Sequence, residues 1–74
     1  PGAYTTYLFE KGQGKICKKL AEEATETIIS VMTGDKTQIT NEVADLLYHL
    51  IVLLVSEDIS WTVVADELRA RREQ

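Results

Sequence analysis

The sequence has only one cysteine, one proline and four glycines among its 74 residues, and aromatic side chains make up 7% of it. A single cysteine excludes a disulfide within the chain and is typical of a protein from the reducing cytoplasm. Because helix-breaking residues are so few, long uninterrupted helices are expected, and no alternating pattern predicts a strand. An excess of basic residues is also lacking. The net charge of −4 argues against a general nucleic-acid-binding protein.

Segments that would direct the chain to a membrane are not apparent either. The apolar run Leu46–Val55 is too short to cross a bilayer, and Tyr48 and His49 interrupt it. The length allows one domain, residues 1–74, whose core would be marginal for independent stability. We therefore expect a cytoplasmic all-α domain with no membrane and no nucleic-acid partner.

Four helices are expected, separated by glycines and turn residues. Gly12-Gln13-Gly14 should end the first helix, and Gly34 should end the second in a left-handed conformation. Asp35 should cap the third helix, with Gln38 at the spacing of a capping box. The four expected ranges are Tyr4–Lys11, Lys15–Thr33, about Lys36–Glu57 and Trp61–Arg71.

The third expected helix is apolar on nearly every side over residues 46–55. A helix that is apolar all round must be buried all round, and three other helices of one short chain could scarcely surround it. A second copy of the chain would supply the missing cover. The predicted architecture is therefore a helical bundle of antiparallel helices, completed by homodimerisation or by a larger assembly.

Two acidic clusters lie in the second and third expected helices: Glu22, Glu23 and Glu26 in one, Glu42 and Asp45 in the other. Glu26 lies eight residues before Gly34 and Glu42 eight residues after it, so an antiparallel hairpin would bring them to matching heights. Carboxylates that converge from two helices suit a hard cation, Mg²⁺ or Mn²⁺. The competing interpretation is a solvated helix face, which would normally place cations at i+4.

The order and spacing of several segments resemble the all-α nucleoside-triphosphate pyrophosphohydrolases, and most closely the phosphoribosyl-ATP pyrophosphohydrolase family of histidine biosynthesis. The segments that carry the resemblance are Tyr4–Gly12, Lys18-Lys19, Glu22–Glu26, Gly34-Asp35 and Ala44–Leu50. The chain departs from the family pattern at Ala21, where the family usually has glycine, and at Gln13-Gly14, which replaces a more helical pair. The helix that usually precedes the Tyr-Thr segment in this family is not part of the sequence.

The resemblance implies Mg²⁺-dependent hydrolysis of phosphoribosyl-ATP to phosphoribosyl-AMP and pyrophosphate. It implies that Glu22 is a further ligand or orients the attacking water. The metal ligands that it implies are Glu23, Glu26, Glu42 and Asp45. Three lysines just before the acids could contact substrate phosphates, although a solvated helix face explains any one of them equally well: Lys15, Lys18 and Lys19.

Three other functions compete with this interpretation. A pyrophosphohydrolase of another nucleoside triphosphate would have the same metal ligands. A ferritin-like redox site would need Glu-x-x-His motifs, which the sequence does not have. A non-enzymatic dimerisation module would explain Leu46–Val55 but would leave the acidic residues without a role. His49 shares the helix face of Glu42 and Asp45, and we expect a hydrogen-bonded core or interface histidine rather than a ligand.

Overall fold

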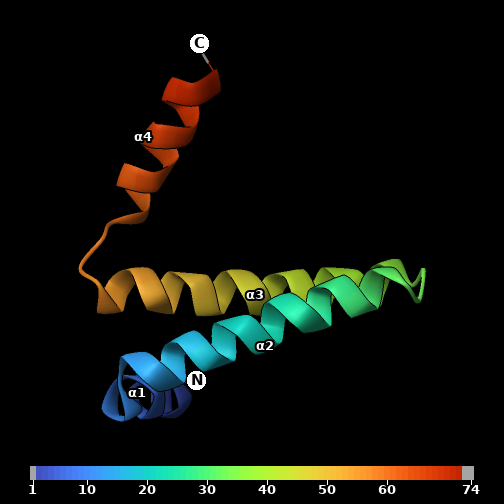
Figure 1. Ribbon diagram of the computed structural model, residues 1–74, viewed down its shortest axis with the longest axis horizontal. Coiled ribbons are helices and arrows are strands. Elements are labelled where there is room, and N and C mark those ends of the chain that lie inside the picture. The colour runs from blue at the N-terminus through green and yellow to red at the C-terminus, as the bar shows by residue number, and fades with distance from the viewer. Residues whose placement is uncertain (1, 73–74) are drawn as a thin grey trace.

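The computed structural model describes residues 2–72 of the chain (Figure 1). It contains α1 (Gly2–Lys11), α2 (Gln13–Val31), α3 (Lys36–Ser56) and α4 (Trp61–Arg72). No strand occurs between residues 2 and 72. The all-α class and the order of the four helices are therefore confirmed.

A single residue, Gly12, separates α1 from α2. Its φ of 90° is open to glycine and strained for other residues, so the helical path breaks there. The Gly12 carbonyl accepts a hydrogen bond from the amide of Ile16 at 3.1 Å, and α2 begins directly afterwards. The expected three-residue break was therefore wrong: Gln13 and Gly14 are helical, and α2 begins two residues before Lys15.

The turn between α2 and α3 makes the two helices an antiparallel hairpin (Figure 1). α2 ends at Val31, two residues before the predicted end, because the amides of residues 32–34 bond to carbonyls only three residues back. Gly34 then takes the predicted left-handed conformation, with φ of 72°. Asp35 caps α3 as predicted, since its carboxylate accepts hydrogen bonds from the amides of Thr37 and Gln38 at 3.0 and 3.3 Å.

The hydrophobic core lies where α1, α2 and α3 meet, and each helix contributes one fully or nearly fully buried side chain. These are Leu8 from α1, Ile16 from α2 and Val52 from α3, with Leu53 packed against them. Leu8 and Ile16 fix the position of α1 against the end of the hairpin. So small a core is consistent with the marginal stability expected from the length of the chain.

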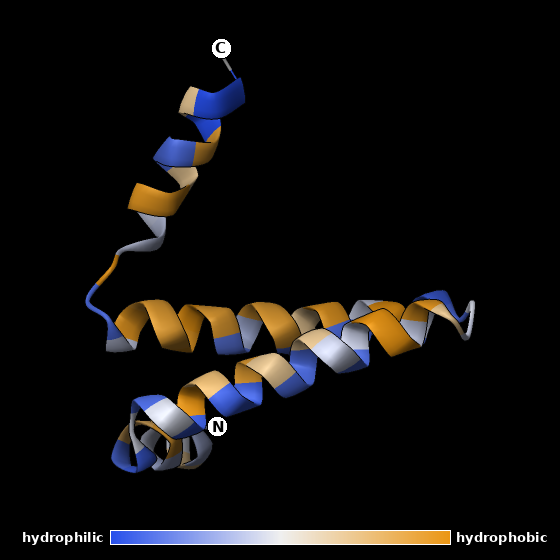
Figure 2. Cartoon of the chain, viewed as in Figure 1, coloured by the Kyte–Doolittle hydropathy of each residue, from blue (hydrophilic) through white to orange (hydrophobic). Residues whose placement is uncertain are grey.

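An apolar surface remains open on the side of α3 that faces away from this core. Leu47, Ile51 and Val55 recur every four residues along it and are 46%, 47% and 59% exposed. Figure 2 shows the long hydrophobic stretch of α3 to which they belong. Length and apolar composition alone would let α3 span a membrane, but the core helix of a helical bundle has the same two properties. As expected from the sequence, one chain does not bury this helix on every side.

The fourth helix stands away from the hairpin, so the described part of one chain does not by itself complete a helical bundle (Figure 1). α4 buries none of its residues, and Trp61, Val63 and Leu68 are exposed. The radius of gyration is 14.2 Å, compared with about 11 Å for a compact domain of this length. The chain is therefore extended rather than globular.

Candidate functional site

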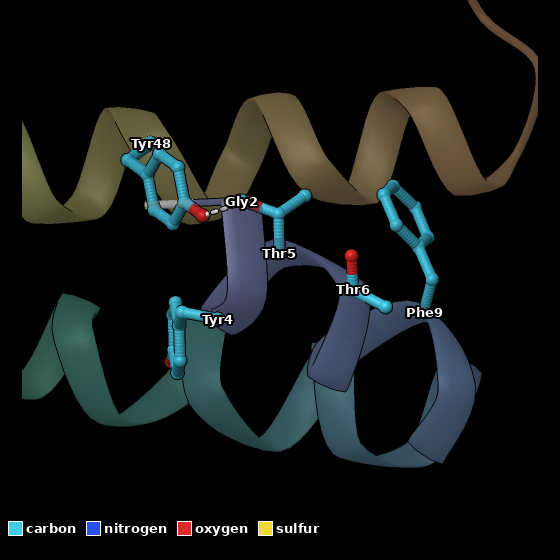
Figure 3. Close-up of a pocket in the computed structure, with 6 residues that line it drawn as sticks. All are labelled: Gly2, Tyr4, Thr5, Thr6, Phe9 and Tyr48. Carbon is cyan, nitrogen blue, oxygen red and sulfur yellow. Dashed lines mark hydrogen bonds between the residues drawn. The ribbon is translucent and has the colours of Figure 1, made fainter.

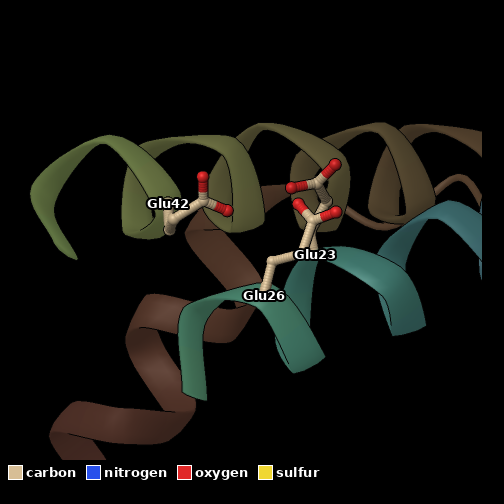
Figure 4. A group of neighbouring side chains, drawn as sticks. All are labelled: Glu23, Glu26 and Glu42. Carbon is tan, nitrogen blue, oxygen red and sulfur yellow. The ribbon is translucent and has the colours of Figure 1, made fainter. Parts of the chain in front are cut away.

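Three carboxylates meet between α2 and α3: those of Glu23, Glu26 and Glu42, which we call the carboxylate cluster. One oxygen from each residue lies within 4.8 Å of the other two. Figure 4 shows Glu23 and Glu26 projecting from α2, and Glu42 from α3, into the space between the helices. The matching heights predicted by counting from Gly34 are confirmed.

A hydrogen bond between the two helices holds the cluster in register. The Thr27 hydroxyl lies 2.8 Å from the carbonyl oxygen of Glu23, one turn before it, and 3.2 Å from the carbonyl oxygen of Glu42. Its hydrogen therefore connects the backbones of two cluster residues. Thr27 was not among the residues predicted from the sequence. Its position four residues after Glu23, on the inner face of α2, was the signal that could have revealed it.

The surroundings of the cluster disfavour negative charge on two of its members. Burial raises the pKa of Glu23, which is 8% exposed, and the nearby Glu26 carboxylate raises it further. The pKa of Glu42 is raised by the same two causes in the same order. One oxygen of Glu23 and one of Glu42 are buried without a hydrogen-bond partner among the described residues.

Burying carboxylate oxygens without partners costs free energy. A bound cation removes this cost because it coordinates the oxygen lone pairs and balances the negative charge. Carboxylate oxygens are also the donors that Mg²⁺ and Mn²⁺ prefer. The donor set, the separation of the oxygens and their missing partners all fit a divalent cation.

Asp45 and Glu22 lie at the edge of this cluster rather than within it. Asp45 is exposed and does not belong to the group of three, yet its charge contributes to the raised pKa values of Glu23 and Glu42. Glu22 pairs with Lys19 at 3.1 Å, and this hydrogen bond lowers the pKa of the Glu22 carboxyl. Glu22 is therefore ionised at neutral pH. Its cationic partner Lys19 lies three residues before it, a position that the search for cations four residues later did not cover.

The three lysines singled out from the sequence occupy different environments. Lys19 is the partner of Glu22. The ammonium group of Lys15 lies over the ring of Tyr7, 5.9 Å from its centroid. Lys18 is exposed, and its charge contributes to the lowered pKa of Glu22. All three lysines therefore lie near the acids, but their ammonium groups do not converge on one point.

His49 is a buried, hydrogen-bonded histidine, as expected. Its Nδ1 donates to the carbonyl oxygen of Asp45 at 2.8 Å. In the neutral ring Nε2 therefore lacks a hydrogen and accepts one from the Tyr4 hydroxyl at 2.9 Å. This bond ties α1 to α3 beside the cluster, where a protonated His49 would lower the pKa of Glu23. Sequence reasoning missed Tyr4 as its partner because the two residues are 45 positions apart.

A large hollow on the described surface does not contain the cluster. It is an open pocket of about 660 Å³ between α1 and α3. Figure 3 shows its lining, in which the Tyr48 hydroxyl is hydrogen-bonded to Thr5. Apolar and aromatic side chains dominate this pocket, whereas a smaller hollow of about 330 Å³ adjoins Glu22 and Glu26. We assign the site from the carboxylates, because charge and missing partners indicate chemistry more directly than size.

Fold and site together define a class: an all-α protein in which two antiparallel helices share a cluster of carboxylates suited to a divalent cation. Comparison with known proteins narrows the class. The family model described as phosphoribosyl-ATP pyrophosphohydrolase matches residues 1–72. The chain belongs to this family, as the resemblance in its sequence indicated.

Curated relatives agree with the family match. The chain is 55% identical over 71 residues to the phosphoribosyl-ATP pyrophosphatase of Streptococcus thermophilus. The aligned region covers 96% of this chain and 68% of that protein. It is 45% identical over 73 residues to a phosphoribosyl-ATP pyrophosphatase of Clostridium botulinum, covering 99% of this chain and 66% of the other. It is also 51% identical over 70 residues to the histidine biosynthesis bifunctional protein HisIE of Caldanaerobacter subterraneus, covering 95% of this chain and 34% of that protein.

Proposed function

We propose that the protein hydrolyses phosphoribosyl-ATP to phosphoribosyl-AMP and pyrophosphate, a step of histidine biosynthesis, with the help of Mg²⁺ or Mn²⁺. The observation that carries the proposal is the carboxylate cluster, in which two buried oxygens lack partners within residues 2–72. Family membership supplies the substrate, which the cluster alone would not distinguish from another nucleoside triphosphate. A cytoplasmic location stays a prediction.

We assign the cation to Glu23, Glu26 and Glu42, with Asp45 as a fourth ligand at the edge of the cluster. A bound divalent cation neutralises phosphate charge and makes a coordinated water more acidic. The chain's own residues provide the rest. Thr27 holds the two helices at a fixed separation, and the Tyr4–His49 bond keeps α1 against them.

Glu22 is the candidate base, or the group that orients the attacking water. Because its pKa is lowered by Lys19, its carboxylate is ionised at neutral pH and can accept a proton from water. Lys15, Lys18 and Lys19 precede the acids on α2, and we assign them to phosphates of the substrate, with Lys18 and Lys19 at the phosphoanhydride because they lie nearest the acids. A cation beside a phosphate oxygen stabilises the negative charge that develops as the phosphoanhydride bond breaks.

The test is release of pyrophosphate from phosphoribosyl-ATP, ATP and dCTP, each with and without Mg²⁺. Phosphoribosyl-ATP should be hydrolysed with the highest kcat/KM, and only when the cation is present. Glu23→Gln and Asp45→Asn should each lower kcat/KM by more than about 100-fold, since metal ligands matter at least as much as the groups that orient them. Helicity measured by circular dichroism should not change.

Glu10→Gln is the matched control, because Glu10 is an exposed glutamate on α1 outside the cluster. It makes the same chemical change and should retain wild-type turnover. A higher kcat/KM for ATP or dCTP than for phosphoribosyl-ATP would indicate that the substrate is another nucleoside triphosphate. Wild-type turnover by Glu23→Gln at ordinary Mg²⁺ would remove the cluster from the mechanism.

We further propose that two copies of the chain form a homodimer, or part of a larger assembly, through the exposed stripe of α3. The stripe of Leu47, Ile51 and Val55 continues toward α4, whose Trp61 and Val63 are also exposed. Covering such a surface releases about 25 cal/mol per Å² of apolar area. This proposal accounts for a chain that is extended and leaves most of its large apolar side chains open to water.

Ile51→Lys tests the assembly more selectively than a change in the core would. Because Ile51 is about half exposed in one chain, a lysine there should be tolerated by the hairpin but not by an apolar interface. Sedimentation at micromolar concentration should show a monomer for Ile51→Lys, and a dimer or larger species for the wild type and for the control Ile51→Val. A monodisperse wild-type monomer would refute the proposal.

A further inference from the structure

Half of the cationic side chains lie within nine residues around the junction of α1 and α2: Lys11, Lys15, Lys18 and Lys19. Two of them converge on one aromatic ring. The Nζ of Lys11 lies 5.8 Å from the centroid of the Tyr7 ring, and the Nζ of Lys15 lies 5.9 Å from it. We call Tyr7, Lys11 and Lys15 together the Tyr7 corner.

The two ammonium groups of the Tyr7 corner have no carboxylate to neutralise them in the described part of the chain. The ion pairs found between residues 2 and 72 use Lys19, Arg69 and Arg71 instead. Two like charges beside one ring repel each other, and the ring face attracts each of them only weakly. An anion bound between them would relieve the repulsion, and a phosphate monoester carries close to two negative charges at neutral pH.

Lys15 of the corner lies on the face of α2 that carries Glu22 and Glu26, at a defined distance from them. Lys15 precedes Glu22 by seven residues and Glu26 by eleven, which is the spacing of a single helix face. At 1.5 Å per residue, Lys15 is about 12 Å from the level of Glu23 and about 16 Å from that of Glu26. A molecule that reached both places would need negative charge at two ends.

Aromatic rings occupy the space between these two charged ends. The Tyr7 and Tyr4 rings are stacked with centroids 6.3 Å apart. The Tyr4 hydroxyl in turn bonds to His49, which lies close to Glu23. The Tyr7 and Tyr4 rings therefore connect the lysines to His49, and their faces suit an uncharged, planar middle portion of a ligand.

We propose that the Tyr7 corner binds the phosphate monoester at the second ribose of phosphoribosyl-ATP, and that Lys11 and Lys15 thereby distinguish this substrate from ATP. The inference rests on the proposed function and adds the residues that would provide its specificity. Phosphoribosyl-ATP has a triphosphate at one end and the monoester at the other, separated by a purine and two riboses. That length is comparable with the distance between the corner and the carboxylate cluster, and the purine would lie along Tyr4.

The experiment compares the double variant Lys11→Ala/Lys15→Ala with the wild type on phosphoribosyl-ATP and on ATP. ATP is followed as a substrate or, where its turnover is slow, as a competitive inhibitor. For phosphoribosyl-ATP, kcat/KM should fall roughly 10- to 100-fold, as expected for lost charged hydrogen bonds. For ATP, kcat/KM as a substrate, or the inhibition constant as a competitor, should change less than about twofold. The double variant Lys11→Arg/Lys15→Arg should recover most of the lost activity.

Lys36→Ala is the control for a general loss of positive charge, because Lys36 begins α3 at the opposite end of the hairpin. It should leave the ratio of the two kcat/KM values unchanged. If the lysine pair only supports Tyr7 structurally, the alanine variant will be less stable, and its kinetic constants for phosphoribosyl-ATP and for ATP will worsen by the same factor. That result, or an unchanged ratio in an active enzyme, would overturn the inference while leaving the proposed function intact. A wild type inactive on phosphoribosyl-ATP would overturn both.

Discussion

Replacing Glu26 by glutamine should make the cation-free protein more stable, although it removes a proposed ligand. Glu26 contributes to the raised pKa of both Glu23 and Glu42 through its charge. An acid whose folded pKa lies above its unfolded value destabilises the fold increasingly as pH rises from about 4 toward the folded pKa. The penalty is therefore fully present at neutral pH and absent in acid. Glutamine keeps the size of the side chain and removes the charge.

The size of the effect follows from the separation of the carboxylates. At 4.8 Å, the upper limit of the separation between the cluster oxygens, two unit charges repel by about 3.5 kcal/mol at an effective dielectric constant of 20 and by about 1 kcal/mol in water. Because Glu26 is exposed, solvent screens it, and we take about 1 kcal/mol for the Glu23–Glu26 pair. In a domain of this length, that corresponds to an increase in Tm of roughly 4–8 °C.

Thermal unfolding in the presence of a chelator measures this gain at pH 7.5 and again near pH 4, with protein concentration held constant. The gain should appear only at pH 7.5, and Glu10→Gln should show none at either pH. Added Mg²⁺ should stabilise the wild type, by about 2.7 kcal/mol at 100 times its Kd, and Glu26→Gln much less. If the chelator leaves the wild-type Tm unchanged and Glu26→Gln melts no higher than the wild type, the three acids do not share a cation site.

Three further predictions concern single residues of the fold. Tyr4→Phe removes the hydroxyl that donates to buried His49, which should lower stability by about 1–3 kcal/mol in thermal unfolding; an equal loss in Tyr7→Phe would show that the hydrogen bond is not the cause. Gly34→Ala should destabilise by about 1–2 kcal/mol, because φ is 72° there and the added Cβ would meet no atom within 4 Å, so only backbone strain changes. Gly14→Ala, which places the same open Cβ inside α2, should instead stabilise by up to about 1 kcal/mol, and a loss of Tm there would contradict the helical assignment of Gly14.

Residues that act through local rules were predictable from the sequence. Asp35 caps the amides two and three residues after it, and Gly34 provides the left-handed turn, so the hairpin follows from a short segment. The register of Glu26 and Glu42 then follows from counting, because both helices rise by the same amount per residue. The part of the site that depends on helical geometry was therefore available from the sequence.

Contacts that depend on side-chain rotamers and on distant segments were not available in this way. The pairing of Lys19 with Glu22 and the position of Asp45 outside the group of three depend on which way each side chain turns on its helix. The Tyr4–His49 bond requires the packing of α1 on the hairpin, which depends on the burial of Leu8 and Ile16. The separation of α4 was also missed, because a hydrophobic pattern identifies a face to be buried but not the chain that buries it.

The isolation of α4 has a consequence for how the protein folds. A 12-residue helix without a buried side chain depends on its own propensity, and in water such a helix is marginal. In a separate chain it would form and melt within about a microsecond, while the hairpin of α2 and α3 closes through a turn of a few residues. Refolding should therefore have a fast phase that is independent of concentration, in which the hairpin forms. In the proposed homodimer, the permanent ordering of α4 should follow in a second-order phase, at a rate set by encounters between chains.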